Sequence, residues 1–187
     1  MNQVNMQEII EGCVRNDRRA QEKLFRAFYG KMMNVVYRYV PDNDTAQEVL
    51  QNAFIKIFEK LATYNNQGSF EGWIRRIVVN TAIDSIRKNK HQFNELSEKN
   101  GAEYFEDPIE QKELEEVIEI KNEMALKAIE ALSPGYRTVF NLYVFEDFTH
   151  KQIAEKLGIS EGSSKSNFAK ARAKLIKILN DQIVNIH

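Results

Sequence analysis

Apolar residues recur at steps of three and four along several segments of the chain, the spacing that gathers side chains on one face of a helix. The first segment predicts a helix over residues 17–40, which Pro41 ends because the residue before a proline is pushed out of the helical region. A second helix is predicted to begin at Asp44, whose carboxylate can cap free amides, with Gln47 completing a capping box.

A loop and a third helix follow. Residues 64–69 combine asparagines, a glycine and a serine without apolar periodicity, which indicates a loop, and the apolar positions resume over about residues 70–88. Three long helices that each have one apolar face can bury a common core. A helical domain is therefore predicted over residues 1–92.

The composition changes beyond this domain. Residues 93–122 contain far more acidic than basic side chains, and Pro108 interrupts them. A segment of this composition buries too little apolar surface to fold alone, so it predicts a flexible acidic linker. Helix-period apolar residues return over residues 123–187 and predict a second, smaller helical domain.

The second domain carries clear helix-boundary signals. Thr149 can cap a helix, with Gln152 three residues on to complete a capping box. Gly158 supplies the left-handed residue that ends this helix, and Ser160 can cap a last helix that runs to about Val184. A short helix, a glycine turn and a long helix are typical of a helix-turn-helix, which projects the start of its second helix toward a major groove. The predicted fold class is all-α, with two small helical domains and a helix-turn-helix in the second.

Bulk properties narrow the classes of function. The chain has 187 residues, a formal net charge of −1 and a pI near 6.3, whereas a free-standing nucleic-acid binder is usually basic. Its single cysteine, Cys13, excludes an internal disulfide and a multi-cysteine metal site. The N-terminus lacks the pattern of a signal peptide, and no apolar run approaches the roughly 20 residues that span a bilayer. A cytoplasmic protein is expected.

The histidines give no sign of catalysis. His91, His150 and His187 are scattered, and the sequence contains no recognisable nucleophile–base pair or metal-ligand spacing. We therefore expect neither an enzyme nor a bound cofactor or metal. His150 directly follows a helix cap and is expected to be a surface residue.

The start of the last helix has the chemistry of a DNA contact. Small hydroxyl residues suit base edges, the following lysines and arginine suit phosphates, and Asn167 could form a bidentate contact with adenine. The candidate contacts are Glu161, Gly162, Ser163, Lys165, Ser166, Asn167, Lys170 and Arg172. The alternative is a solvated helix face on an ordinary bundle.

A second group of candidate contacts surrounds the third helix of the first domain. Basic residues stand beside aromatic rings and loop amides there, and unstacked bases can lie against such rings while cations hold the backbone. The candidates are Tyr64, Asn65, Asn66, Ser69, Phe70, Trp73, Arg76, Asn80, Asp84 and Arg87. Trp73 lies on the apolar stripe, so a core position is the alternative for it, and Phe70 is open between the two.

In combination, these segments resemble the extracytoplasmic-function group of bacterial sigma factors, which are two-domain proteins of the sigma-70 type. Residues 44–58 resemble the family's polymerase-binding helix, residues 69–84 its promoter-melting segment, and residues 132–172 its promoter-reading domain. The resemblance implies a sigma factor that binds core RNA polymerase, directs it to specific promoters and assists DNA melting. The polymerase contacts that it implies are Asp44, Gln47, Glu48, Gln51, Asn52 and Lys56.

The resemblance also divides the work between the domains. The first would recognise and melt the minus-ten element, with a flipped base held by the loop 64–69, and the helix from Glu161 would read the minus-thirty-five element. The acidic linker would thread the polymerase's RNA path. The implied partners are core RNA polymerase, promoter DNA and an anti-sigma factor, which can be membrane-anchored although this chain is not expected to be a membrane protein.

Two residues depart from the family pattern. Ser164 stands where the family usually has a branched apolar residue, and Asn167 stands where a basic residue is common. Both put in question which bases are read. Two rival interpretations remain: a stand-alone helix-turn-helix regulator that binds operators as a dimer, and a helical module that binds only protein.

Overall fold

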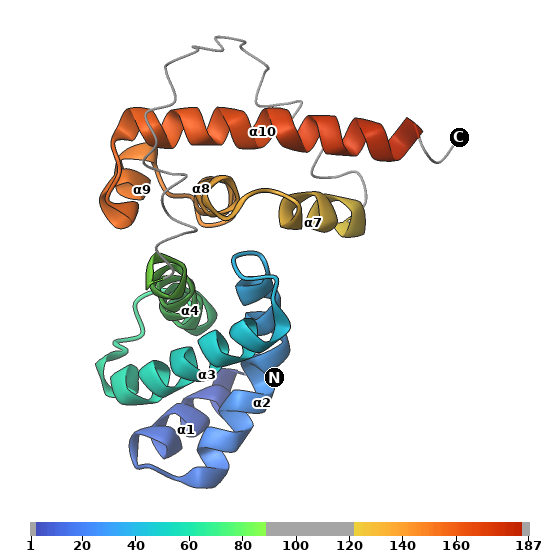
Figure 1. Cartoon of the computed structure of the whole chain (residues 1–187). Helices are drawn as coiled ribbons and strands as arrows, with labels where there is room; N and C mark the ends of the chain where they lie inside the picture. Colours follow the sequence, from blue (N-terminus) through green and yellow to red (C-terminus); the bar gives the residue numbers. More distant parts are fainter. Residues whose placement is uncertain (1–2, 89–121, 185–187) are drawn as a thin grey trace. The chain divides into compact units, whose positions relative to one another are not determined.

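The computed structural model describes residues 3–88 and 122–184, and every regular element in these two ranges is a helix (Figure 1). The chain divides into two compact units, Met1–Ser85 and Ile86–His187, called the N-terminal and the C-terminal unit below. The predicted all-α class with two small helical domains is confirmed. The predicted linker, residues 93–122, lies outside the described residues except for its last residue.

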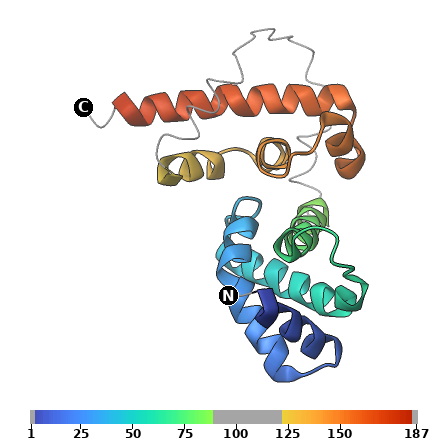
Figure 2. The ribbon, with the colours of Figure 1, turned by 180° about the vertical axis from the view of Figure 1, so that it is seen from behind.

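The N-terminal unit packs a helical core. Its elements are α1 (Gln3–Val14), α2 (Arg18–Tyr37), α3 (Asn43–Lys60), the 3-10 helix η1 (Leu61–Thr63) and α4 (Phe70–Lys88), whose last residues pass the unit boundary (Figures 1 and 2). α1 packs against α2 and η1, and α2 packs against α3. The largest fully buried side chains of this unit are Leu24, Met32, Tyr39, Leu50, Ile57, Leu61 and Ile74.

The first helix of this unit, α1, was not predicted. It is short, and its stability comes from contact with α2 rather than from its own pattern. The two helices come close together at Gly12, because a Cβ atom there would lie only 2.6 Å from the Cβ of Ala20. Cys13 beside it is buried, and burial raises the pKa of its thiol to about 11 with a smaller contribution from Asp17.

The predicted capping of the second long helix was wrong. Asp42, not Asp44, is the N-cap of α3, and its carboxylate accepts a hydrogen bond from the backbone N–H of Thr45 at 2.9 Å. Asp42 directly follows Pro41 and has the extended backbone that an N-cap needs, so the helix begins before Asp44. The hydrogen bonds to Asp42 lower the pKa of its carboxyl. The preceding helix α2 ends at Tyr37 rather than at residue 40.

The C-terminal unit is organised around its longest helix. It contains α7 (Asn122–Glu130), α8 (Pro134–Val144), α9 (His150–Leu157) and α10 (Glu161–Val184), and α10 packs against the other three (Figure 2). The buried cluster at its centre consists of Ala128, Ile129, Leu132, Phe140, Ala171 and Leu175. Among the helices described in both units, none has the length and apolar character needed to cross a membrane.

Candidate nucleic-acid interfaces

Three aromatic rings gather where the loop 64–69 meets the start of α4. The ring centroid of Tyr64 lies 5.0 Å from that of Phe70 and 5.5 Å from that of Trp73. Phe70 and Trp73 stack at 5.8 Å, and Phe28 of α2 meets Phe70 edge-on at 5.7 Å. The rings of Tyr64, Phe70 and Trp73 are half-buried, so this aromatic cluster packs on the core and also keeps part of its surface open.

Hydrogen bonds give the loop a defined shape. The hydroxyl of Tyr64 donates to the carbonyl oxygen of Gly68 at 3.1 Å, and the hydroxyl of Ser69 accepts from the backbone N–H of Gly72 at 3.0 Å at the start of α4. The φ angles of Asn66 and Gly68, 60° and 84°, place both in the left-handed region, which asparagine and glycine tolerate best. The exposed polar candidates on this loop are Asn65, Asn66 and Ser69.

The polar candidates on α4 differ in exposure. Arg76, Asp84 and Arg87 are exposed, whereas Asn80 is half-buried. The carboxylate of Asp84 lies 3.5 Å from the ammonium of Lys56 on α3. The side chains of Lys56 and Asp84 are 39% and 56% exposed, so water screens this ion pair and it contributes only about 0–1 kcal/mol. The ion pair nevertheless connects Asp84, a predicted DNA contact, with Lys56, a predicted polymerase contact. No pattern in the sequence indicated that these two residues lie side by side.

The predicted polymerase contacts share the exposed side of α3. Asp44, Gln47, Glu48, Gln51 and Asn52 are exposed, and Lys56 is half-buried. Ile55 lies in the same row and was not predicted as a contact, although its side chain is 54% exposed. The signal was available, because Ile55 is a large apolar residue that falls off the buried stripe of its helix.

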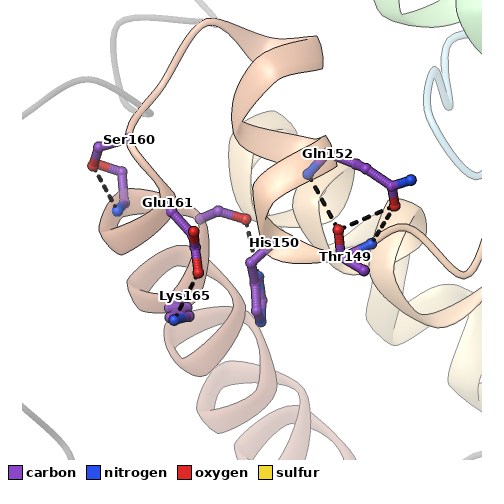
Figure 3. Close-up of polar contacts among 8 residues, drawn as sticks. Thr149, His150, Gln152, Ser160, Glu161 and Lys165 are labelled. Carbon is purple, nitrogen blue, oxygen red and sulfur yellow. Dashed lines mark hydrogen bonds and ion pairs between the residues drawn. The ribbon is translucent and has the colours of Figure 1, made fainter.

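The caps of the helix-turn-helix agree with the prediction (Figure 3). The hydroxyl of Thr149 accepts from the backbone N–H of Gln152 at 3.3 Å, and the Gln152 carboxamide oxygen accepts from the backbone N–H of Thr149 at 2.8 Å. Gly158 ends α9 in the left-handed conformation with a φ angle of 69°. The hydroxyl of Ser160 accepts from the backbone N–H of Ser163 at 2.9 Å and caps α10. Both helix starts are therefore fixed by side chains.

The first turns of α10 separate the candidate contacts into an exposed and an enclosed set. The exposed candidates, called the recognition row below, are Glu161, Gly162, Lys165 and Ser166, whereas Ser163, Lys170 and Arg172 are half-buried. The carboxylate of Glu161 lies 2.8 Å from the ammonium of Lys165 (Figure 3). The hydrogen bond and the charge of Lys165 lower the pKa of Glu161. The row thus presents paired charges beside a small hydroxyl.

Asn167, predicted as a residue that could contact adenine, is only 6% exposed in this structure. Asn167 lies on a buried row with Ser164, Ala171 and Leu175, and its position on this row outweighs its polar character. Counting back four and seven residues from Ala171 would have placed both polar residues on that row. The Nε and Nη2 atoms of Arg172 are also enclosed, which leaves less of its guanidinium for a phosphate.

His150 is not the surface residue that was expected. Its ring is half-buried and stacks on Tyr143 with 4.6 Å between centroids. Its Nδ1 shares a hydrogen bond with the hydroxyl of Ser164 at 3.0 Å (Figure 3). Burial lowers the pKa of His150, Lys165 lowers it further, and Glu161 opposes both.

Comparison with known proteins finds a family match for each of the two units. The chain matches the family model "Sigma-70 region 2" over residues 24–92 and the model "Sigma-70, region 4" over residues 122–175. The RNA polymerase sigma-H factor of Pseudomonas aeruginosa is 28% identical over 180 residues, which cover 92% of this chain and 93% of that protein. The ECF RNA polymerase sigma factor SigW of Bacillus subtilis is 26% identical over 179 residues, which cover 92% and 95%.

A solved structure is similar over most of the chain. The sigma factor RpoE in complex with the anti-sigma factor NepR from Bartonella quintana aligns with a TM-score of 0.48 and 17% identity, covering 85% of this chain and 96% of that one. The two sigma-70 regions match in order along a single chain, and the sigma-H factor and SigW both align over nearly their whole length. The sigma-70 family is not a class of enzymes. This chain belongs to the extracytoplasmic-function group of the sigma-70 family.

Proposed function

We propose that this protein is an RNA polymerase sigma factor, which binds core polymerase, directs it to specific promoters and assists DNA melting. The observation that carries the proposal is the presence of region 2 over residues 24–92 and region 4 over residues 122–175 in one chain. A stand-alone regulator would need the helix-turn-helix and an effector pocket or a dimer interface in its first domain. It would have no use for the exposed row on α3.

The two units divide the work in this proposal. Residues 1–92 bind polymerase and recognise and melt the minus-ten element, and residues 123–187 recognise the minus-thirty-five element. Residues 93–122 form the acidic linker between them. A modest net charge of −1 fits this role, because polymerase supplies most of the electrostatic attraction to DNA.

The polymerase interface is the exposed side of α3. Ile55 lies toward the C-terminal end of this side and is an exposed apolar residue next to polar and charged ones, a combination that is common in protein interfaces. We assign the interface to the contacts predicted from the sequence, namely Asp44, Gln47, Glu48, Gln51, Asn52 and Lys56. Ile55 is added as an apolar contact at the C-terminal end of this row.

The minus-ten site is the aromatic cluster with the adjoining loop. The partly open rings of Tyr64, Phe70 and Trp73 offer stacking surfaces for unpaired bases, and the exposed amides of Asn65 and Asn66 offer hydrogen bonds. Exposed polar residues on α4 extend the site toward duplex DNA. These are Arg76, Asp84 and Arg87.

The minus-thirty-five site is the recognition row at the start of α10. Lys165 can contact guanine or phosphate, and Glu161 can accept a hydrogen bond from the amino group of cytosine. The hydroxyl of Ser166 can donate a hydrogen bond to a base or accept one from it. The half-buried Lys170 adds a cation one turn further on. Asn167 is left out of this site because it is buried.

The proposal extends to the setting in which the protein acts. As a sigma factor it performs no catalysis of its own, and it works in the cytoplasm, where bacterial polymerase transcribes. The family resemblance implies a further partner, an anti-sigma factor, which can be membrane-anchored. Such a partner would withhold the protein from polymerase until a signal releases it.

Run-off transcription from a fragmented genomic library tests the proposed function. Bacterial core polymerase is compared with and without the protein, and discrete new transcripts that share a pair of upstream sequences are expected. If no transcripts arise while the protein alone shifts specific DNA, the stand-alone regulator becomes the better account. If it neither starts transcripts nor shifts DNA, a module that binds only protein is left.

A further inference from the structure

The imidazole of His150 links α9 to two other helices of the C-terminal unit. His150 is the first residue of α9, and its ring stacks on Tyr143 of α8 with an interplanar angle of 18°. The same ring lies edge-on to Phe168 of α10, with 5.7 Å between centroids, and Tyr143 and Phe168 are 4.5 Å apart. Two rings therefore hold the imidazole in one orientation.

Ser164 connects the imidazole of His150 to α10 through a hydrogen bond. Its side chain is fully buried on α10, and its hydroxyl shares the 3.0 Å hydrogen bond with Nδ1 of His150. A buried hydroxyl that loses its hydrogen-bond partner is destabilising, because burial has already removed its hydrogen bonds to water. Because a hydrogen bond is directional, the bond favours one placement of Ser164 relative to the clamped ring.

The placement of Ser164 determines which way the recognition row faces. Successive residues on a helix are separated by about 100° of rotation, since a turn has about 3.6 residues. Lys165 follows Ser164 directly, and Glu161 lies one turn before Lys165 on the same face. Any rotation of α10 about its axis would therefore turn both charged groups away from their present direction.

We infer that His150 is a positioning residue for promoter recognition, because through Ser164 it sets the rotation at which α10 presents Glu161, Lys165 and Ser166 to DNA. The inference rests on the proposed function and deepens it. It assigns control of minus-thirty-five recognition to a ring that acts through another residue. It also gives a role to Ser164, one of the two residues at which the sequence departs from its family.

Two substitutions at His150 distinguish the contribution of its hydrogen bond from the contribution of its aromatic ring. His150→Phe keeps an aromatic ring but removes Nδ1, whereas His150→Asn removes the ring but keeps a hydrogen-bonding atom near the position of Nδ1. Promoter opening is measured with the complete holoenzyme on a promoter recovered by run-off transcription. His150→Phe is expected to raise the half-saturating promoter concentration about tenfold, equivalent to about 1.4 kcal/mol, and to leave the maximal opening rate unchanged. His150→Asn is expected to restore part of the affinity.

A scrambled minus-thirty-five element and a matched variant serve as controls. On the scrambled promoter, His150→Phe and the unsubstituted protein should need the same promoter concentration. Glu155→Ala, a change at an exposed residue of α9, should behave like the unsubstituted protein on both promoters. Adding Ser164→Ala to His150→Phe should cause less loss than the sum of the two single changes, because both remove the same bond.

Several results would overturn the inference. Unchanged affinity of His150→Phe would do so, as would an equal loss on the intact and the scrambled promoter. A loss that matched the fraction of unfolded protein, measured by circular dichroism in the same buffer, would show a merely structural role. If the unsubstituted protein gave no promoter-dependent transcription, the proposed function itself would fail. An active protein that is indifferent to His150→Phe would overturn only this inference.

Discussion

The two candidate DNA-contacting regions both contain ring contacts and hydrogen bonds, but they differ in which of the two holds the contacting residues. In the N-terminal unit, Tyr64, Phe70 and Trp73 support one another by ring contacts. In the C-terminal unit, capping hydrogen bonds and the bond between His150 and Ser164 hold the recognition row. Apolar packing is largely non-directional, whereas hydrogen bonds depend on angle and distance. The first region should therefore depend on aromatic volume and the second on orientation.

The largest effect on promoter recognition should come from a change that prevents binding to core polymerase, because both DNA-contacting regions act only when the protein is bound to it. Glu48→Lys combined with Gln51→Lys reverses the charge of the exposed side of α3 without touching its core, since both residues are exposed. Unfavourable charge at an interface costs several kcal/mol, so the affinity for core polymerase should fall about 100-fold, or about 2.7 kcal/mol. Binding is measured by fluorescence anisotropy with labelled protein.

Glu8→Lys is the matched control, because it makes a similar charge change on the exposed side of α1. It should bind polymerase like the unsubstituted chain. Unchanged binding of the double variant would remove α3 from the polymerase interface.

The next largest effect is expected on the rate of promoter opening when the aromatic cluster alone is changed. Tyr64→Ala removes a ring from the aromatic cluster, and a stacked base is worth about 1–3 kcal/mol, so the rate of promoter opening should fall about 5- to 150-fold. Tyr64→Phe keeps the ring and loses only the hydrogen bond to Gly68, so its opening rate should stay close to normal. Stopped-flow fluorescence of a labelled promoter measures both rates. An equal defect in the two variants would contradict a stacking role.

A smaller effect is expected for the cations of the second region. Lys165→Ala with Lys170→Ala should weaken holoenzyme binding to the promoter by about tenfold and reduce its salt dependence by about one unit of slope per lost phosphate contact. Affinity for core polymerase should not change. Lys127→Ala, an exposed change on α7, is the control. If polymerase binding and promoter binding fell together, the proposed division of labour would be wrong.

The smallest effect is a pH dependence confined to the second region. Burial and Lys165 hold the pKa of folded His150 below its ordinary value of 6.5, against the opposing charge of Glu161. Lys151 on the same helix also lies near this group of charges, and Tyr143 is the titratable residue on α8 that faces the ring. The unfolded chain therefore binds more protons near pH 6. Stability from neutral His150 is complete above about pH 6.5 and is lost as the pH falls through the lower folded pKa.

Hydrogen exchange checks this pH dependence. Amides of α9 and α10 should exchange faster relative to those of α3 as the pH falls below about 6.5, after correction for the intrinsic exchange rate. His150→Phe should remove the difference. A difference that persisted in the variant would assign the pH dependence to another group.

The comparison also explains how much the sequence could predict. Helix boundaries in the C-terminal unit were predictable because Thr149, Gln152 and Gly158 have side-chain or backbone preferences that act locally. The helix α1 was not predictable in this way, because it depends on the close approach of Gly12 to Ala20 in another helix. Local signals thus identified the caps of α9 and α10 but misplaced the cap of α3, and tertiary packing determined whether α1 forms.

The candidate sites follow the same rule. Aromatic residues near the loop could be predicted as a group, since ring chemistry is visible in the sequence. The placement of Asn167 and Ser164 required the helical phase to be extended from apolar neighbours, and polar character misled the prediction for Asn167. The role of His150 depends on rings and a hydroxyl from two other helices, and no local pattern reveals that.

The central claim, that each unit reads its own promoter element, is tested most directly by scrambling the two elements one at a time. Open-complex formation is measured for the unsubstituted holoenzyme, Tyr64→Ala and Lys165→Ala on each promoter. Tyr64→Ala should add no further loss once the minus-ten element is scrambled, and Lys165→Ala should add none once the minus-thirty-five element is scrambled. Each variant should keep its full effect when only the other element is scrambled. If both variants lost the same factor on every promoter, the two units would not read separate elements and the account would be contradicted.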